Sequence, residues 1–222
     1  MKTDSQRMRN RTSGFSLLEM TIVVALIIIL ASIAYVSLIP LLKQQRVTNA
    51  YNITLGAMRQ ARDNAVSQRT SYSVTFAQAT SSSAATITVA PTLTGFQGDQ
   101  NTLTYTLPTD VGFNALSGIP ATNTPDSFGS GAAAIDFGYT MNGSGYTGGQ
   151  STIYFCPDGS SQNTTGGGAC AGPGYWSGGV IYIARQGEIL SSRAITLWGG
   201  TGRIRGWRLY PASTGAYQWL RQ

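Results

Sequence analysis

A carboxylate stands inside the most apolar stretch of the chain. Residues 15–42 read FSLLEMTIVVALIIILASIAYVSLIPLL, and Glu19 is the only side chain there that is charged near pH 7. A carboxylate in hydrocarbon costs about 2.5 to 3.5 kcal/mol even on the gentler insertion scales, and such residues usually have a partner. The sequence therefore predicts that Glu19 meets a positive charge from outside this stretch.

Arginines gather near the C-terminus. Residues 70–184 hold five Asp and no Lys or Arg, whereas residues 185–222 hold six Arg and one Glu. Arg203 and Arg205 would point to one face of a strand, and Arg208 follows among aromatic residues (Trp207, Tyr210, Tyr217 and Trp219). Arginines among aromatic rings can hold phosphates while the rings stack on bases. The alternatives are a solvated edge strand that blocks sheet pairing, salt bridges to the acidic part of the chain, and docking on another protein.

The chain has no histidine, so a Ser-His-Asp or Cys-His site cannot be built. The acids of the C-terminal region are few and scattered: Asp99, Asp110, Asp126, Asp136, Asp158 and Glu188. Residues 143–148 match GxGxxG in letters, but a strand rather than a helix is predicted to follow, which favours a hairpin loop over a dinucleotide site. We therefore expect no catalytic residues, no cofactor and no metal.

The apolar stretch can span a membrane. As a helix rising about 1.5 Å per residue, residues 15–42 exceed the bilayer core of roughly 30 Å. Residues 1–14 carry Lys2 and three Arg against Asp4, so the positive-inside rule keeps this arm cytoplasmic and predicts that the rest is translocated. An ordinary secretory signal cleaved after Ala34 is the alternative, although its apolar core would have only about 7 to 15 residues.

Cys156 and Cys170 are the only cysteines and flank a Gly-rich run. Buried thiols and metal ligands are alternatives, but the absence of histidine and of a CxxC pair argues against zinc. Translocation would place both in an oxidising compartment. A disulfide is favoured, closing a loop of about 15 residues and contributing about 3 kcal/mol in the chain-entropy model.

The run Gly14-Phe15-Ser16-Leu17-Leu18-Glu19 resembles the cleavage and methylation signature of type IV prepilins and type II secretion pseudopilins. The resemblance implies that a prepilin peptidase cuts between Gly14 and Phe15 and methylates the new Phe15 amine. It also implies that Glu19 faces the Phe15 amine of a neighbouring subunit in a helical filament. Partners would then be the peptidase, other pilin or pseudopilin subunits and the inner membrane, with the head in the periplasm.

Behind the apolar stretch, residues 43–69 predict that the helix continues with one apolar face. Its positions are three and four residues apart: Val47, Tyr51, Leu55, Met58, the stem of Arg62, and Ala65. This half is expected to lie against a globular head over residues 70–222.

The head is predicted to be mostly antiparallel sheet. Alternating runs predict strands at 71–76, 85–90, 103–107, 134–141, 151–155, 178–184, 194–198 and 203–210. Turns are expected at Asn142-Gly143 and Asp158-Gly159, and residues 77–84 and 108–133 are expected to be loops. The predicted fold is α+β and pilin-like: leader 1–14, membrane and filament-core helix 15–42, amphipathic helix 43–69, and head.

The C-terminal strands are similar to the ends of minor pseudopilins of the GspH and FimT group. FimT-like pilins carry a Gly-Arg-x-Arg motif that binds incoming DNA, and Gly202, Arg203 and Arg205 match it. Three functional classes follow: a pilus or secretion pseudopilus subunit, a DNA-uptake pilin using Arg203, Arg205 and Arg208, and a secreted adhesin.

Overall fold

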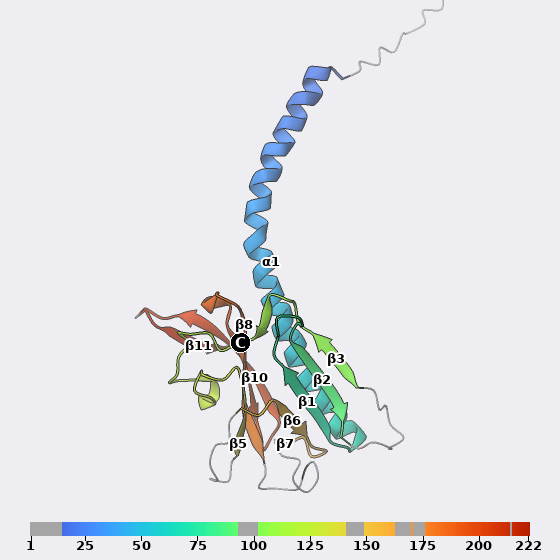
Figure 1. Ribbon diagram of the computed structural model, residues 1–222, viewed down its shortest axis with the longest axis vertical. Helices are drawn as coiled ribbons and strands as arrows, with labels where there is room; N and C mark the ends of the chain where they lie inside the picture. Colours follow the sequence, from blue (N-terminus) through green and yellow to red (C-terminus); the bar gives the residue numbers. More distant parts are fainter. Residues whose placement is uncertain (1–14, 93–101, 141–148, 163–169, 171–175, 214) are drawn as a thin grey trace, which may run out of the picture. The chain divides into compact units, whose positions relative to one another are not determined.

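A single helix dominates the N-terminal part of the chain (Figure 1). The computed structural model describes residues 15–92, 102–140, 149–162, 170, 176–213 and 215–222, without the side chains of residues 36 and 140. Helix α1 runs Leu17–Gln68, with Pro40 inside it. Pro40 removes a backbone donor without ending the helix. Arg69, whose φ is 53°, adopts the left-handed conformation that commonly terminates helices. The predicted continuous helix is confirmed.

Contacts divide the chain into two units, residues 1–43 and 44–222. In the first unit, the large apolar side chains described between Phe15 and Leu42 are exposed. By length and composition, α1 is long and apolar enough to cross a membrane. An exposed apolar surface of this extent indicates that lipid or other protein covers it.

The second unit contains two antiparallel sheets (Figure 1). The five-stranded sheet has the order β3-β2-β1-β6-β7, and the six-stranded sheet has the order β11-β10-β9-β8-β4, with β5 also paired to β8. The strand bounds are β1 Tyr72–Ala77, β2 Thr86–Pro91, β3 Leu103–Thr106, β4 Val111–Phe113, β5 Ile135–Thr140, β6 Thr152–Phe155, β7 Ser161–Gln162, β8 Ser177–Arg185, β9 Arg193–Trp198, β10 Arg203–Pro211 and β11 Tyr217–Arg221. One long helix with antiparallel sheets is the predicted α+β, pilin-like layout.

All eight predicted strands are present, with ends shifted by a residue or so. The prediction of a loop over 108–133 is wrong in part, because β4 and the short 3₁₀ helix η1, Pro125–Ser127, lie within it. Strands β7 and β11 were also not predicted. The Asp158-Gly159 turn is confirmed, with Gly159 at a φ of 82° between the paired strands β6 and β7.

The expected Asn142-Gly143 turn and the GxGxxG run lie outside the described residues. The strands on either side belong to different sheets, since β5 pairs with β8 and β6 pairs with β1. An isolated antiparallel bridge joins Phe137 to Gln150.

The second half of α1 packs on both sheets. Val47, Tyr51, Met58 and Ala65 are at most 8% exposed and share a core with side chains of β1, β2, β6, β8 and β9. The predicted apolar face is therefore confirmed, with Leu55 only partly buried. A smaller core lies on the opposite face of the six-stranded sheet, where side chains of segment 114–134 and of β11 pack with Val180, Tyr182, Ala194 and Leu209.

Gly206 of β10 lies directly against Tyr51 of α1. A Cβ atom at this position would lie 1.6 Å from the Tyr51 hydroxyl oxygen and 2.8 Å from its ring carbon Cζ. The absence of a side chain at Gly206 therefore leaves room for the hydroxyl end of Tyr51 against the strand.

We expect Gly206→Ala to lower the free energy of unfolding by about 1 to 3 kcal/mol, because the strand or the helix must move to admit the methyl group. Adding Tyr51→Phe should recover part of the loss by removing the nearest atom. Gly56→Ala in α1 is the matched control: nothing lies within 4 Å of its Cβ, so helix propensity should make it up to about 1 kcal/mol more stable. Denaturant unfolding in detergent, followed by tryptophan fluorescence, measures all four. Equal stability of Gly206→Ala and the unmodified chain would contradict the close packing.

Candidate functional site

The predicted processing segment begins outside the described residues, since these exclude Gly14. Phe15 is 76% exposed, and Glu19 lies exposed in the first turn of α1. A helix N-terminus favours a nearby carboxylate through the backbone dipoles. Among the described residues Glu19 has no ion pair, so a cation that compensates it must come from elsewhere.

The structure does not bring the three C-terminal arginines together. The register of β9 and β10 pairs Arg205 with Thr196 and Arg208 with Arg193. Because side chains alternate along a strand, Arg203 and Arg205 share the outer face of the sheet, whereas Arg208 lies on the face toward α1. The guanidinium of Arg208 lies 5.1 Å from the ring centre of Tyr210.

Arg205 is held by a partner that is remote in sequence. Its Nη1 lies 2.5 Å from Oδ1 of Asp126, whose side chain is 6% exposed. The Thr196 hydroxyl donates to the other Asp126 oxygen at 2.5 Å, and the indole N–H of Trp207 donates to Thr196 at 3.1 Å. The Arg205 guanidinium also lies 5.5 Å from the ring centre of Trp198. For Arg205, the salt-bridge alternative is therefore the one that the structure supports.

Arg203 is the exposed arginine of the Gly-Arg-x-Arg motif. Within the described part of the chain its side chain has no ion pair or hydrogen bond. The preceding Gly202 is buried, has a φ of 56°, and would place a Cβ 2.0 Å from the carbonyl oxygen of Gly159. Arg62 of α1 donates to that oxygen at 3.3 Å and to the Thr201 carbonyl at 3.2 Å. The glycine and Arg62 thus fix the turn from which Arg203 extends.

The aromatic residues near these arginines have mostly structural contacts. Trp219 is 8% exposed and lies 5.6 Å, centre to centre, from the buried ring of Tyr182. Burial, followed by the nearby Asp136 carboxylate, raises the pKa of Tyr182 well above its usual value. Trp207 and Tyr217 pack against the same small core. The predicted stacking surface is therefore largely occupied by the protein itself.

The expected disulfide is present between Cys156 and Cys170, whose Cα atoms lie 5.5 Å apart. Cys156 follows the last residue of β6, and its backbone N–H donates to Ser160 at 2.9 Å around the Asp158-Gly159 turn. The disulfide therefore fixes the end of a turn that Arg62 also contacts through Gly159.

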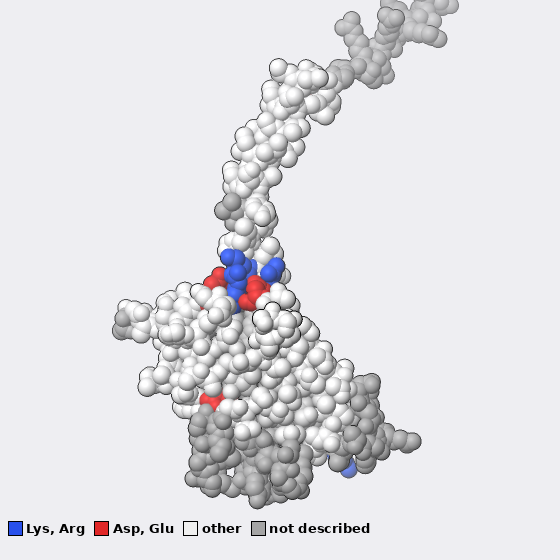
Figure 2. All heavy atoms as spheres, in the orientation of Figure 1, with Lys and Arg blue, Asp and Glu red and all other residues white. Residues whose placement is uncertain are grey.

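A chain of ion pairs was not found by sequence reasoning. Asp110 Oδ2 lies 3.4 Å from Arg46 and 3.2 Å from Arg185, and Arg185 also pairs with Glu188. Figure 2 shows basic and acidic side chains gathered next to one another on the face that it presents. The two long-range pairs of Asp110 and the Arg185–Glu188 pair, three residues apart, neutralise charge locally. Mixed clusters of this kind are ordinary structural features.

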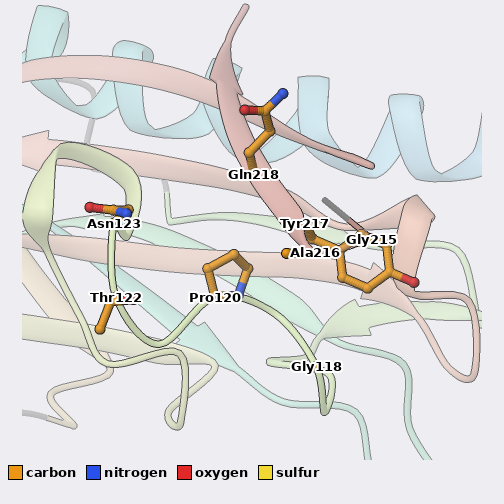
Figure 3. A pocket seen from close by; sticks show the side chains of 8 residues that line it. All are labelled: Gly118, Pro120, Thr122, Asn123, Gly215, Ala216, Tyr217 and Gln218. Atoms are coloured by element: carbon orange, nitrogen blue, oxygen red, sulfur yellow. The ribbon is translucent and has the colours of Figure 1, made fainter. Parts of the chain in front are cut away.

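A shallow hollow lies between segment 118–123 and β11 (Figure 3). Its volume is about 500 Å³, and its lining residues are Gly118, Pro120, Thr122, Asn123, Gly215, Ala216, Tyr217 and Gln218. Its lining side chains include the hydroxyl groups of Thr122 and Tyr217 but no carboxylate, amine, guanidinium or thiol.

Comparison with protein families gives one finding. The family described as "Prokaryotic N-terminal methylation motif" matches residues 9–35, which include Gly14, Phe15 and Glu19. The chain carries a prepilin-type N-terminus. This match supports a type IV pilin-like protein that a prepilin peptidase processes. Comparisons with curated proteins and with solved structures gave no match.

We expect Asp126→Ala to lower the free energy of unfolding by about 2 kcal/mol, because Arg205 and Thr196 lose their acceptor together. This value is below the 3 to 5 kcal/mol typical of fully buried pairs, since Arg205 is partly exposed. Asp126→Ala combined with Arg205→Ala should cost less than the sum of the two single changes.

Asp63→Ala is the control, because Asp63 is exposed on α1 and has no ion pair within the described ranges. It should change stability by less than about 0.5 kcal/mol. Denaturant unfolding of the unmodified chain, the two single variants and the double variant gives the coupling energy. Strict additivity would contradict the assigned pair.

Proposed function

We propose that this protein is a minor pilin or pseudopilin subunit that assembles into a type IV pilus or a type II secretion pseudopilus. The observation that carries the proposal is the methylation motif at residues 9–35, which overlaps the exposed apolar side chains of residues 15–42. Secreted adhesins cleaved by signal peptidase do not need such a motif. The activity is assembly, and no catalytic residue, cofactor or metal is assigned.

The N-terminal segment would act in two steps. A prepilin peptidase at the inner membrane cuts between Gly14 and Phe15 and methylates the freed amine. The leader stays cytoplasmic and the head is periplasmic, as the basic arm before the apolar run favours. Each mature subunit then begins with a cationic amine a few residues before Glu19.

Assembly would satisfy two features of α1 at once. Apolar helix packing covers the exposed side chains between Phe15 and Leu42, and Glu19 meets the Phe15 amine of a neighbour. A carboxylate left unpaired in an apolar interior is costly, so a shifted arrangement of subunits is disfavoured. Glu19 therefore sets the stagger between subunits.

The decisive measurement is mass spectrometry of the mature N-terminus after expression with a prepilin peptidase. We expect a chain that starts at a methylated Phe15. A chain that starts at an unmodified Tyr35 would contradict the proposal and favour the secreted adhesin. Glu19→Gln is the matched variant: it should be cleaved at the same bond yet be lost from filaments purified from the same cells, because it removes charge with little change of shape.

Within this class we propose the GspH and FimT group, on the C-terminal Gly202-Arg203-x-Arg205 run. DNA binding is the second candidate function, and exposed arginines on the outer face of the six-stranded sheet favour it. Arg203 is exposed there, and Arg221 is exposed on β11 opposite Trp207. Arg205 and Arg208 are held by Asp126 and Tyr210, so the interface would use Arg203 and Arg221 in place of the three arginines of the motif region.

We expect weak binding of double-stranded DNA. A plot of the logarithm of the binding constant against the logarithm of the salt concentration should have a slope of about −2, one unit for each arginine that meets a phosphate. Arg203→Ala should reduce the slope by about one unit, whereas Arg59→Ala, an exposed arginine of α1, should leave it unchanged. Fluorescence anisotropy across a salt series makes the comparison. If the folded chain shows no affinity at low salt, the pilus or secretion function stands without a DNA role.

A further inference from the structure

Two arginines face each other on the side of the six-stranded sheet that packs on α1. Arg193, the first residue of β9, is the cross-strand partner of Arg208 on β10. Arg193 is 3% exposed, and Arg208 is half-buried. Cβ atoms of directly opposed residues lie only about 4.5 to 5.5 Å apart, and like charges in such a pair destabilise a sheet. This pair therefore costs stability unless something compensates it.

Among the described residues, this pair is compensated only in part, by the ring of Tyr210, whose centre lies 5.1 Å from the Arg208 guanidinium. The Nη1 atom of Arg193 and the Nε atom of Arg208 are buried and lack a hydrogen-bond partner there. A buried charge that is neither paired nor hydrogen-bonded destabilises the folded state. Each of the two arginines therefore has one buried donor nitrogen that lacks an acceptor among the described residues.

The neighbouring tyrosines do not supply negative charge. Tyr51 places its hydroxyl over Gly206, two residues before Arg208 on the same face of β10. Burial raises the pKa of Tyr51, so it stays a neutral phenol. Burial, then Arg208, lowers the pKa of Arg193 to about 10, which still leaves it charged at neutral pH. The group consists of two cations and a hydroxyl donor.

The acids of the described head are bonded elsewhere. Asp110 and Glu188 pair with Arg185, Asp126 pairs with Arg205, and Asp158 accepts from Ser160. Asp136 accepts from the Gly149 N–H. Outside the masked segments, no head carboxylate is left to neutralise Arg193 and Arg208.

We propose that Arg193 and Arg208, with the Tyr51 hydroxyl beside them, bind a phosphate group. Guanidinium forks match phosphate oxygens in pairs, and a phosphate offers more acceptor oxygens and charge than a carboxylate, as two arginines and a phenol require. Arg208 and Tyr210 are partly exposed and give access from solvent. The source of the phosphate group is either free phosphate or the headgroup of an anionic phospholipid. The second source is included because Tyr51 follows the apolar run 15–42 on the same helix by only about two and a half turns.

The test uses the full chain in dodecyl maltoside, with thermal unfolding followed by tryptophan fluorescence. Sodium phosphate is compared with sodium chloride at equal ionic strength, and phosphatidylglycerol is added to the micelles in phosphate-free buffer. We expect one of the two additions to raise the unfolding temperature by about 2 to 4 °C at concentrations well above the dissociation constant. A rise with phosphate identifies the free anion as a ligand, and a rise with the lipid alone identifies the headgroup.

Arg193→Met and Arg208→Met should each abolish the rise, whereas Arg203→Met, the same change on the outer face of β10, should retain it. Arg208 is partly exposed, so Arg208→Met keeps the test valid if Arg193→Met does not fold. An equal rise in all variants would overturn the proposal, because phosphate also stabilises proteins by exclusion from their surfaces. No rise of the unmodified chain with either addition would overturn it as well.

Discussion

The buried stripe on the second half of α1 is the constraint on which the head depends. Val47, Met58 and Ala65 lie in one core with strands of both sheets, and the sheets meet there, for example where Phe76 of β1 stacks on Phe137 of β5 at 5.5 Å. Alanines 50, 57, 61 and 65 are fully or almost fully buried, and their small side chains allow the helix backbone to approach the strands. The helix is therefore the centre of the core of the second unit as well as its N-terminal element.

Acidic and basic residues that are separated in the sequence form ion pairs in the fold. The acidic stretch 70–184 supplies Asp110 and Asp126, and the basic stretch 185–222 supplies Arg185 and Arg205 to meet them. The resulting pairs are partly buried, so they are screened less by salt than exposed pairs would be. The imbalance in composition therefore does not produce an equally polarised surface, and Arg193 and Arg208 stand out because no described acid reaches them.

Periodic elements could be predicted from the sequence, and elements without a period could not. The helix and eight strands have enough residues to show spacings of 3.6 or 2, whereas β4 and β7 have three and two residues and cannot. Strand β11 has five residues, but its exposed Leu220 interrupts the alternation of apolar and polar side chains. The disulfide followed from having two cysteines and no histidine. The Asp126–Arg205 pair joins residues 79 apart and depends on how segment 114–134 lies over the sheet, which no local pattern encodes. The separation of Arg208 from Arg203 was readable from strand alternation alone.

Strand β10 shows why a letter motif does not define a surface. Its three arginines have three environments: Arg203 is exposed, Arg205 is held by Asp126, and Arg208 faces Arg193 on the opposite side. Whether each arginine is available at the surface depends on the face of the sheet on which its side chain lies and on what covers that face. The same reasoning applies to α1, where an uncovered apolar surface occurs on the same helix as Glu19, which has no ion pair among the described residues. Packing against copies of itself would cover the surface and supply the cation together, so a single assembly step removes both costs.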